Sequence, residues 1–322
     1  MKTIGWVFLG IVVGITGTTS VAQNPPPGFG AVAQYRFGIG AKALSLGAAF
    51  TATAEGAEGL YWNPAGLVGT SASIGGMYTE PFSGLGGQAL DYRIQYLGVV
   101  APVNEVGLGA GWFNVHVGGI PYSDEGSTFD YDSSVFLGGL AVRLDLTEAT
   151  SLAVGLTAKL YRERMLEGHA QGVGFDVGLL ADFGAVRVGY CSQDVGGTRY
   201  RWQGTGQEPE MQVPWVHRVG VSARWSEGLV TTSGEAVLEG GASPGLRLGA
   251  EWAPIENLAL RGGVRLEAAG DAGYQAVWSA GFGVSWSALI LDAAYLRNPV
   301  SGFSGGSDLS TDTYIVSVEI RL

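Results

Sequence analysis

Basic side chains spaced between apolar residues are the positions in this chain best suited to hold a ligand. A carboxylate buried among apolar groups needs a cationic partner, so a lysine or arginine in a greasy channel would bind a carboxylated apolar molecule. Such cations can equally pair with acids of the chain itself or anchor one segment to another. The sequence leaves both interpretations open. The candidates are Lys42, Arg93, Lys159, Arg187, Arg218, Arg224, Arg247, Arg261 and Arg265.

Histidine, serine and cysteine show no catalytic arrangement. His116, His169 and His217 lie about 50 residues apart, without the close spacing of a zinc site. His217 and Ser222 differ by an odd number of positions, so in a strand they point to opposite faces. Cys191 is expected to be a small buried residue. We predict that the protein is not an enzyme and holds no metal ion or cofactor.

Composition and charge exclude several classes of protein. The chain has 322 residues, 54 of them Gly, and only 15% are charged, against about 25% in ordinary soluble domains. A formal net charge of −11 offers no basic face for phosphate backbones, so nucleic acid is not an expected partner. With 46% hydrophobic residues, the chain is too apolar for a disordered linker. A folded, strand-rich protein remains.

The first 22 residues are typical of a secretory signal peptide. Lys2 precedes an apolar stretch over residues 4–15, and Ser20, Val21 and Ala22 give the small-residue pattern of a cleavage site. The stretch is shorter than the ~20 residues of a spanning helix, although a retained anchor is the alternative. We expect cleavage after Ala22 and export of residues 23–322.

Strict alternation predicts transmembrane strands. Glycine or charge interrupts every apolar run before it reaches the length of a spanning helix. In the segment 151–161, Leu152, Leu156 and Leu160 share one face while Thr157 and Lys159 share the other. An exported chain that is apolar on one face of each strand is expected to form a closed barrel. A soluble β-sandwich also alternates and is the alternative.

The spacing of turns predicts an all-β, antiparallel transmembrane barrel of about fourteen strands over residues 70–322. Tight connections and longer ones alternate, as periplasmic turns and external loops do in bacterial barrels. The longer ones include 118–132, 195–212 and 298–311. The glycine-rich stretch 231–242 is poorly marked, so the count carries a margin of two. The strands are expected to begin near residues 70, 89, 105, 133, 150, 172, 185, 213, 228, 245, 257, 274, 288 and 312.

Aromatic and glycine residues add two expectations. Aromatic side chains near strand ends or on the apolar face are typical of interfacial girdles, and core packing is the alternative. Glycines clustered within strands permit the close approach of something inside the barrel. The aromatic residues are Trp112, Trp215, Trp225, Trp252, Trp278, Trp286 and Tyr295, and the glycines include Gly107, Gly109, Gly111, Gly281 and Gly283.

The segment 23–69 does not alternate and is expected to form short helices. A Gly- and Ala-rich stretch from Gly40 leads to the run Tyr61, Trp62, Asn63, Pro64, Ala65 and Gly66. This run resembles the N-terminal hatch of FadL-type outer-membrane transporters and, more closely, of the PorV/PorQ family. The resemblance implies that residues 23–69 plug the barrel lumen. A plain turn into the first strand is the alternative for the Asn-Pro-Ala element.

The same resemblance implies two functions. The first is a FadL-like channel that moves small hydrophobic, fatty-acid-like molecules across the outer membrane of a Gram-negative (diderm) bacterium, with outer-membrane lipid and the hydrophobic ligand as partners. The alternative is a PorV-like component of type IX secretion, with exported proteins or secretion-system subunits as partners of the long loops. A continuous apolar path favours transport, whereas a sealed lumen beneath large ordered loops favours secretion.

Overall fold

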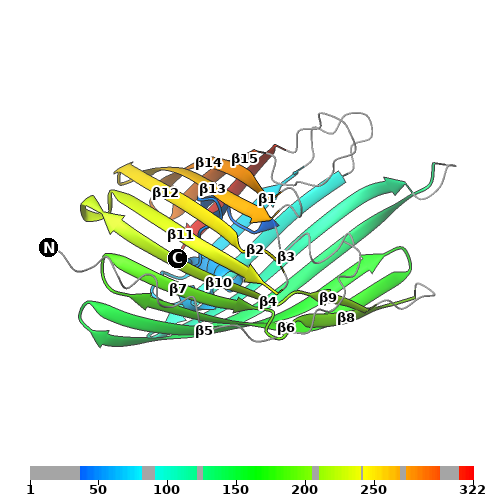
Figure 1. Ribbon diagram of the computed structural model, residues 1–322, viewed down its shortest axis with the longest axis horizontal. Coiled ribbons are helices and arrows are strands. Elements are labelled where there is room, and N and C mark those ends of the chain that lie inside the picture. The colour runs from blue at the N-terminus through cyan, green and yellow to red at the C-terminus, as the bar shows by residue number, and fades with distance from the viewer. Residues whose placement is uncertain are drawn as a thin grey trace.

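Alternating residues build a closed ring of tilted antiparallel strands around a short helical segment (Figure 1). The computed structural model describes residues 37–81, 91–121, 126–204, 210–240, 242–268, 273–297 and 312–322. Sequential neighbours pair around the sheet, β1 pairs with β16, and β5 pairs with β6, so the sheet has no free edge. All backbone groups of a spanning strand then find partners within the ring, as a membrane requires. The predicted all-β barrel with an N-terminal plug is confirmed.

The described strands range from four to twenty residues. They are β1 (Ser73–Thr79), β2 (Asp91–Val103), β3 (Val106–Pro121), β4 (Thr128–Thr147), β5 (Thr150–Met165), β6 (Gly168–Asp182), β7 (Val186–Gln193), β8 (Thr198–Gln203), β9 (Glu210–Val213), β10 (Val216–Trp225), β11 (Val230–Glu239), β12 (Gly245–Ile255), β13 (Leu258–Ala268), β14 (Tyr274–Trp286), β15 (Leu289–Arg297) and β16 (Thr313–Arg321).

These sixteen segments occupy fourteen positions in the ring. One edge of β6 pairs with β8 near its start and with β7 near its end, so β7 and β8 together form one interrupted strand. β9 pairs with β8, and β10 pairs with β7, so β9 and β10 form the next interrupted strand. Positive φ angles at Asp194, Gly196 and Gly197 carry the chain through the first interruption. The predicted count of fourteen is therefore confirmed.

The longer connections are shorter than the sequence indicated. β3 extends to Pro121 and β4 starts at Thr128, so most of 118–132 is strand. β8 and β9 lie within 195–212, and only Leu166 and Glu167 separate β5 from β6. Polar residues in these segments favour loops, but antiparallel pairing continues beyond the membrane because it satisfies the backbone there as well. The segment 298–311 lies entirely outside the described residues.

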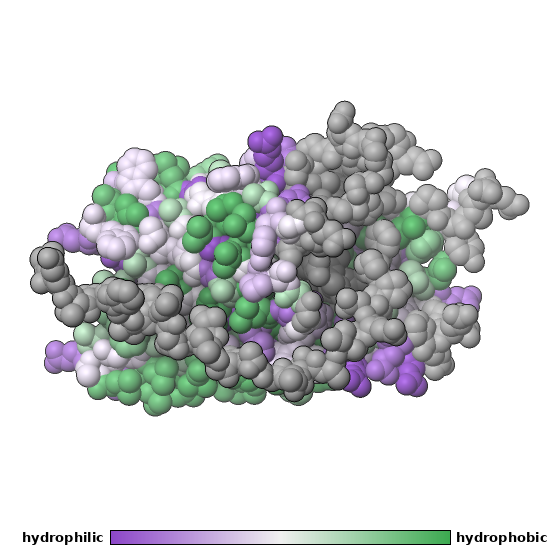
Figure 2. Space-filling model, viewed as in Figure 1, coloured by the Kyte–Doolittle hydropathy of each residue, from purple (hydrophilic) through white to green (hydrophobic). Residues whose placement is uncertain are grey.

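The outward face is apolar, as predicted. Leu156, Leu248 and Val316 are exposed, whereas their chain neighbours Thr157, Arg247 and Ile315 are buried. Hydrophobic residues accordingly gather along the lower edge of the outer surface in Figure 2. Tryptophans join this face: Trp215, Trp225, Trp252, Trp278 and Trp286 are all exposed.

On β2 the predicted assignment of faces is wrong. Ile94 and Tyr96 are buried in the barrel, and Arg93 lies on the opposite, outward face beside Asp91, whose carboxylate is 2.5 Å from its guanidinium. The sequence prediction places the polar face of each strand inward. Near the external end of the barrel, however, the outer surface lies beyond the hydrocarbon of the membrane. Polar residues can therefore face outward there, and the lumen can be apolar.

The short helical segments lie inside the ring, where the blue part of the ribbon runs in Figure 1. They are α2 (Ala41–Ser45), a 3₁₀ turn η1 (Gly56–Glu58), α3 (Gly59–Trp62) and a second 3₁₀ turn η2 (Pro64–Leu67). We call residues 37–67 the hatch. No helix among the described residues is long and apolar enough to cross a membrane. The expected signal peptide, residues 1–22, lies outside the described residues.

Candidate functional site: the barrel lumen and its hatch

Aromatic packing gives the hatch its own small core. The Trp62 indole Nε1 donates to the carbonyl of Ile39 at 2.9 Å and joins the two ends of the hatch. Phe50 and Tyr61 both pack edge-on against Trp62, with ring centroids 6.1 and 5.0 Å away. Burial of three aromatic rings stabilises a segment whose helices are too short to persist alone.

Asn63 connects the hatch to itself and to the barrel. Its backbone is extended, which ends α3, and its side-chain oxygen accepts from the Ala65 N–H at 3.1 Å to cap η2. Its side-chain Nδ2 donates to the carbonyls of Thr51, at 2.9 Å, and of Leu179 on β6, at 3.1 Å. Pro64 supplies the fixed φ of a first helical position. The predicted turn at Asn63 and Pro64 is present, and it is fully buried.

Glycines in the wall let the hatch backbone touch the barrel backbone. A Cβ on Gly178 would overlap the Asn63 side-chain oxygen, and one on Gly155 would overlap the Pro64 backbone. Gly107 meets Leu67 in the same manner. These contacts confirm that glycines in the strands accommodate a segment inside the lumen. The same relation holds on the other side for Gly189, Gly249, Gly263 and Gly281.

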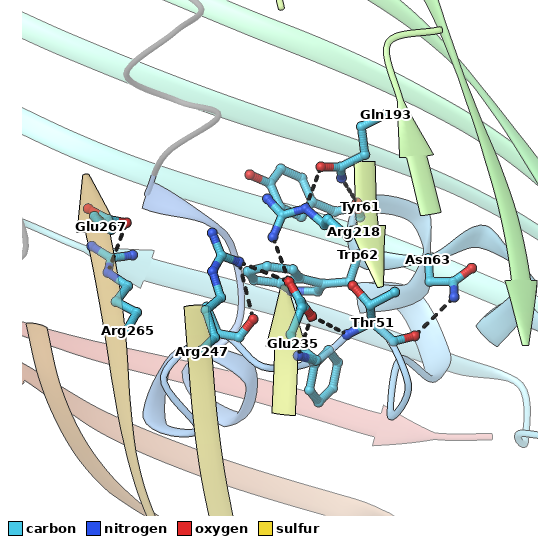
Figure 3. A network of polar contacts seen from close by, with 12 residues as sticks. Thr51, Tyr61, Trp62, Asn63, Gln193, Arg218, Glu235, Arg247, Arg265 and Glu267 are labelled. Atoms are coloured by element: carbon cyan, nitrogen blue, oxygen red, sulfur yellow. Dashed lines mark hydrogen bonds and ion pairs between the residues drawn. The ribbon is translucent and has the colours of Figure 1, made fainter. Parts of the chain in front are cut away.

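Glu235 on β11 is the centre of a buried polar network that holds the hatch (Figure 3). One carboxylate oxygen lies 3.1 Å from Arg218 and 3.3 Å from Arg247. The other accepts from the backbone N–H groups of Phe50, at 3.1 Å, and Thr51, at 2.9 Å. One acid thus neutralises two cations of the wall and satisfies two backbone donors of the hatch.

Arg218 and Arg247 reach the hatch as well. The Arg218 Nε donates to Gln193 Oε1 at 2.6 Å, and Gln193 Nε2 donates in turn to the Tyr61 carbonyl at 2.7 Å. The Arg218 guanidinium also lies 5.2 Å from the centre of the Trp62 ring. Arg247 donates to the Ala48 carbonyl at 3.2 Å. Figure 3 shows these side chains converging on the hatch from several strands.

Lys159 forms a second buried cluster beside the strand interruption. Its ammonium lies 2.7 Å from the Asp176 carboxylate and 2.8 Å from that of Asp194. Tyr161 and Thr198 both donate hydroxyl hydrogen bonds to Asp194. The network fixes the bend between β7 and β8, because Asp194 is one of the residues with positive φ.

The other predicted cations are also bonded to groups of the protein. Lys42 pairs with Glu55 at 2.5 Å within the hatch, and Arg224 donates to the Gly184 carbonyl. Every luminal cation on the predicted set therefore has a protein partner. The remaining pairs are Arg187 with Asp182 at 2.6 Å, Arg261 with Glu251 at 2.6 Å and with Asp292 at 2.5 Å, and Arg265 with Glu267 at 3.3 Å.

Sequence reasoning missed Glu235, Gln193 and Asp194. Glu235 falls in the poorly marked stretch 231–242, although its spacing of two from Ser233 was a usable signal for the inward face. Gln193 shares the face of Cys191, which is buried as expected. Asp194 carried no signal, because its place depends on the interruption after β7.

Opposite these networks the lumen has an apolar wall. Side chains of β1 to β4, β15 and β16 point inward there and form one buried cluster with Leu44, Tyr61 and Trp62 of the hatch. We call this set the apolar wall: Met77, Ile94, Tyr96, Phe113, Val115, Val117, Tyr131, Val135, Leu137, Leu296 and Ile315.

The other end of the hatch faces a polar cavity of about 180 Å³ near the tight turns. Lys42 and Glu55 of the hatch and Arg187, Arg224 and Glu251 of the strands line it. The Lys42 ammonium lowers the pKa of Glu55. The two sides of the hatch therefore differ, with an apolar surface toward the external rim and a charged one toward the turns.

Glu58 is the hatch acid that lacks a cationic partner at bonding distance among the described residues. Burial, with the carboxylates of Asp292 and Glu319 nearby, raises the pKa of Glu58 to about 8. Its carboxyl group lies against Gly40, where a Cβ would overlap it. No group of three or more potential metal ligands occurs among the described residues.

Solved structures with a similar architecture include a toluene transporter and a hydrocarbon channel. The toluene transporter TbuX of Ralstonia pickettii superposes with a TM-score of 0.59 at 13% identity, covering 88% of this chain and 98% of that one. The CymD monoaromatic hydrocarbon channel gives 0.61 at 14%, with coverage of 88% and 98%. A FadL homologue of Pseudomonas aeruginosa gives 0.59 at 12%, with coverage of 87% and 97%.

These likenesses show that the chain has the fold of the FadL-type barrels. No protein-family model matches the sequence. No curated protein matches it either. The likeness to the PorV/PorQ family rests on the hatch motif alone.

Proposed function

We propose that this protein is an outer-membrane channel for small, neutral, hydrophobic molecules. The apolar wall is the observation that carries the proposal, because its buried side chains lead from the external rim to the aromatic surface of the hatch. A hydrophobic solute would leave water along this wall at little cost. The fold shared with hydrocarbon channels supports the same function.

We favour a neutral solute over the fatty-acid-like one that the sequence implied. A buried carboxylate needs an unpaired cation, and the luminal Lys159, Arg218 and Arg247 already bond to protein carboxylates. Bringing in another carboxylate would break these pairs. No feature of the described residues favours the secretion alternative.

Passage requires the hatch to move. The hatch touches the barrel on both the apolar and the ion-paired sides, so we infer that a solute on the apolar wall competes with the aromatic contacts of the hatch. A small displacement of residues 37–67 away from this wall would open a path while Glu235 keeps the other side attached.

The test is uptake of labelled toluene and labelled decanoate by cells that carry the chain in their outer membrane. We expect faster toluene uptake than in cells without it, and no gain for decanoate.

Val135→Thr puts a hydroxyl on the apolar wall at nearly constant volume, and it should lower toluene uptake several-fold. Val230→Thr, at the first residue of β11, is the matched control and should leave uptake unchanged. Equal uptake with and without the protein would refute the proposal, as would a preference for decanoate. Accumulation of exported proteins inside a deletion strain would favour the secretion role.

A further inference from the structure

Hydrogen-bond donors gather on the outward face at the external end of β5, β6 and β8. In the register of these strands, Arg162 pairs with Gln171, and Gln171 pairs with Arg201. One step further out, Arg164 pairs with His169, and His169 with Gln203. All six side chains are exposed. We call Arg162, Gln171, Arg201, Arg164, His169 and Gln203 the donor array.

The donor array begins where the apolar outer surface ends. Below it, on β4, β5 and β6, Phe136 pairs with Leu160, and Leu160 pairs with Val173. Phe136 and Val173 are exposed, as expected for residues in hydrocarbon. The Arg162 guanidinium lies 5.7 Å from the centre of the Phe136 ring. The array therefore sits at the height where acyl chains give way to headgroups.

Four arginines gather on the outward face at this end of β5 and β8. The chain has 18 Lys and Arg and a net charge of −11, yet four arginines point outward here, Arg199 among them. Arg199 and Arg201 share one acid, Glu210, at 3.9 and 3.5 Å. No ion pair neutralises Arg162 or Arg164 among the described residues, and the neighbouring Asp132 is bound by His116 at 2.9 Å.

The surface is also hollowed at this point. An open cavity of about 510 Å³ is lined by the array residues of β6 and β8, together with Ala170, Arg199, Tyr200 and Glu210. In Figure 2 the corresponding lower edge changes from hydrophobic to hydrophilic toward the end where β8 lies in Figure 1. Within each row, neighbouring donors are about one strand spacing (~4.8 Å) apart, and planar or charged donors at this spacing can bind the oxygens of a phosphate group.

We propose that the donor array binds the phosphate groups of a lipid in the outward-facing leaflet, whose acyl chains lie on Phe136, Leu160 and Val173. Arginine suits this role because its guanidinium gives two parallel hydrogen bonds to a phosphate. Gln171 lies between Arg162 and Arg201 in the first row. His169 lies between Arg164 and Gln203 in the second row. The site is independent of the lumen and of what passes through it.

The experiment measures lipid retained by the full chain, purified in a non-ionic detergent, with native mass spectrometry. The probe is diphosphoryl lipid A, and its dephosphorylated form is the comparison. We expect the phosphorylated lipid to bind and the dephosphorylated one to be lost. Arg162→Gln with Arg201→Gln should weaken binding roughly tenfold. The matched control is Arg143→Gln with Arg321→Gln, which removes the same charge from a half-buried and an exposed arginine at the turn end of the barrel and should leave binding unchanged.

Further arms separate the sources of phosphate. Equal binding of both lipids would overturn the proposal, as would equal binding by the array variant and the control variant. Displacement of the lipid by millimolar inorganic phosphate would make the array a free-anion site and would also overturn it. Loss of binding with EDTA would assign the contact to a metal bridge on Glu210 rather than to the arginines. Gln171→Glu places a carboxylate between the arginines without removing either, and it should weaken binding even if the double variant folds poorly.

Discussion

The two sides of the lumen bind the hatch through different kinds of contact. On the side of β5 to β12, buried charges are paired with one another and hydrogen-bonded to hatch backbone, as Glu235 is to Phe50 and Thr51. On the side of β1 to β4, the wall meets the hatch mainly through apolar contacts such as Phe113 against Tyr61, with ring centroids 6.0 Å apart. Its hydrogen bonds to the hatch join neutral groups: the Tyr96 hydroxyl donates to the Ala57 carbonyl, and the Gly40 N–H donates to Met77 Sδ. Directional bonds fix a position, whereas apolar contacts are easily exchanged for a solute. The ion-paired side thus acts as the anchor and the apolar wall as the path.

Glu235→Ala should break this comparison most severely. It leaves Arg218 and Arg247 buried without their acid and removes the acceptor of two hatch N–H groups. Loss of one partner of a buried pair costs about 3–5 kcal/mol. We expect faster hydrogen exchange in residues 40–67 and a lower midpoint of unfolding in denaturant. Glu239→Gln, further along the same strand, is the control and should behave as wild type. Unchanged exchange in the Glu235 variant would remove Glu235 as the anchor.

Gly178→Ala should have a smaller effect at the same anchor. The added methyl group overlaps the Asn63 side-chain oxygen, so Asn63 must give up its bond to Leu179. Overpacking of this kind costs about 1–3 kcal/mol. Unfolding in denaturant is the measurement, and Gly138→Ala is the control, because nothing lies within 4 Å of a Cβ there. Equal stability of the two variants would show that the backbone contact is not tight.

Val135→Ala sharpens the comparison from the apolar side. It removes buried methyl groups and should cost about 1–2 kcal/mol of overall stability. Because the anchor is intact, hydrogen exchange in residues 47–52 should stay at the wild-type rate, unlike in the Glu235 variant. Faster exchange there would mean that both sides hold the hatch equally, and the division into anchor and path would fail.

A last prediction concerns pH and Glu58. The pKa of Glu58 is raised to about 8 in the folded protein, above its value of about 4.3 in an unfolded chain. The folded state therefore holds a proton that the unfolded state releases. This contribution to stability is complete below pH 4 and decreases as pH rises toward 8. Protection of the hatch amides, expressed relative to the intrinsic exchange rate at each pH, should fall between about pH 4 and 8, and Glu58→Gln should abolish that fall. A pH profile identical in the two proteins would contradict the assignment to Glu58.

Most of the barrel was readable from the sequence because its period is local. Alternation at Leu152 to Lys159 and the turns near Ser287 depend only on neighbouring residues, and both are found as expected. The interrupted strand was not readable. Its bend depends on Asp194 meeting Lys159, and these residues are 35 positions apart in the sequence.

The site was only partly readable for a related reason. Alternation tells which residues share a face but not which face points inward, and Arg93 shows that polarity is a poor guide at the external end. The pairing of Arg218 with Glu235 also could not be read, since it joins adjacent strands whose register the sequence does not specify. The hatch position followed instead from the motif around Asn63.

The glycines that face the hatch also restrict how this protein can evolve. At Gly155 and Gly178 the obstacle to a larger residue is main chain or a fully bonded amide, so trimming a side chain elsewhere cannot create room. Compensating changes would have to rebuild the plug and the cylinder together. We expect relatives that keep the plug to conserve these glycines, whereas their lipid-facing leucines and valines can be exchanged for other apolar residues. The pattern of inward-facing glycines should therefore identify such relatives better than the pattern of outward-facing hydrophobic residues.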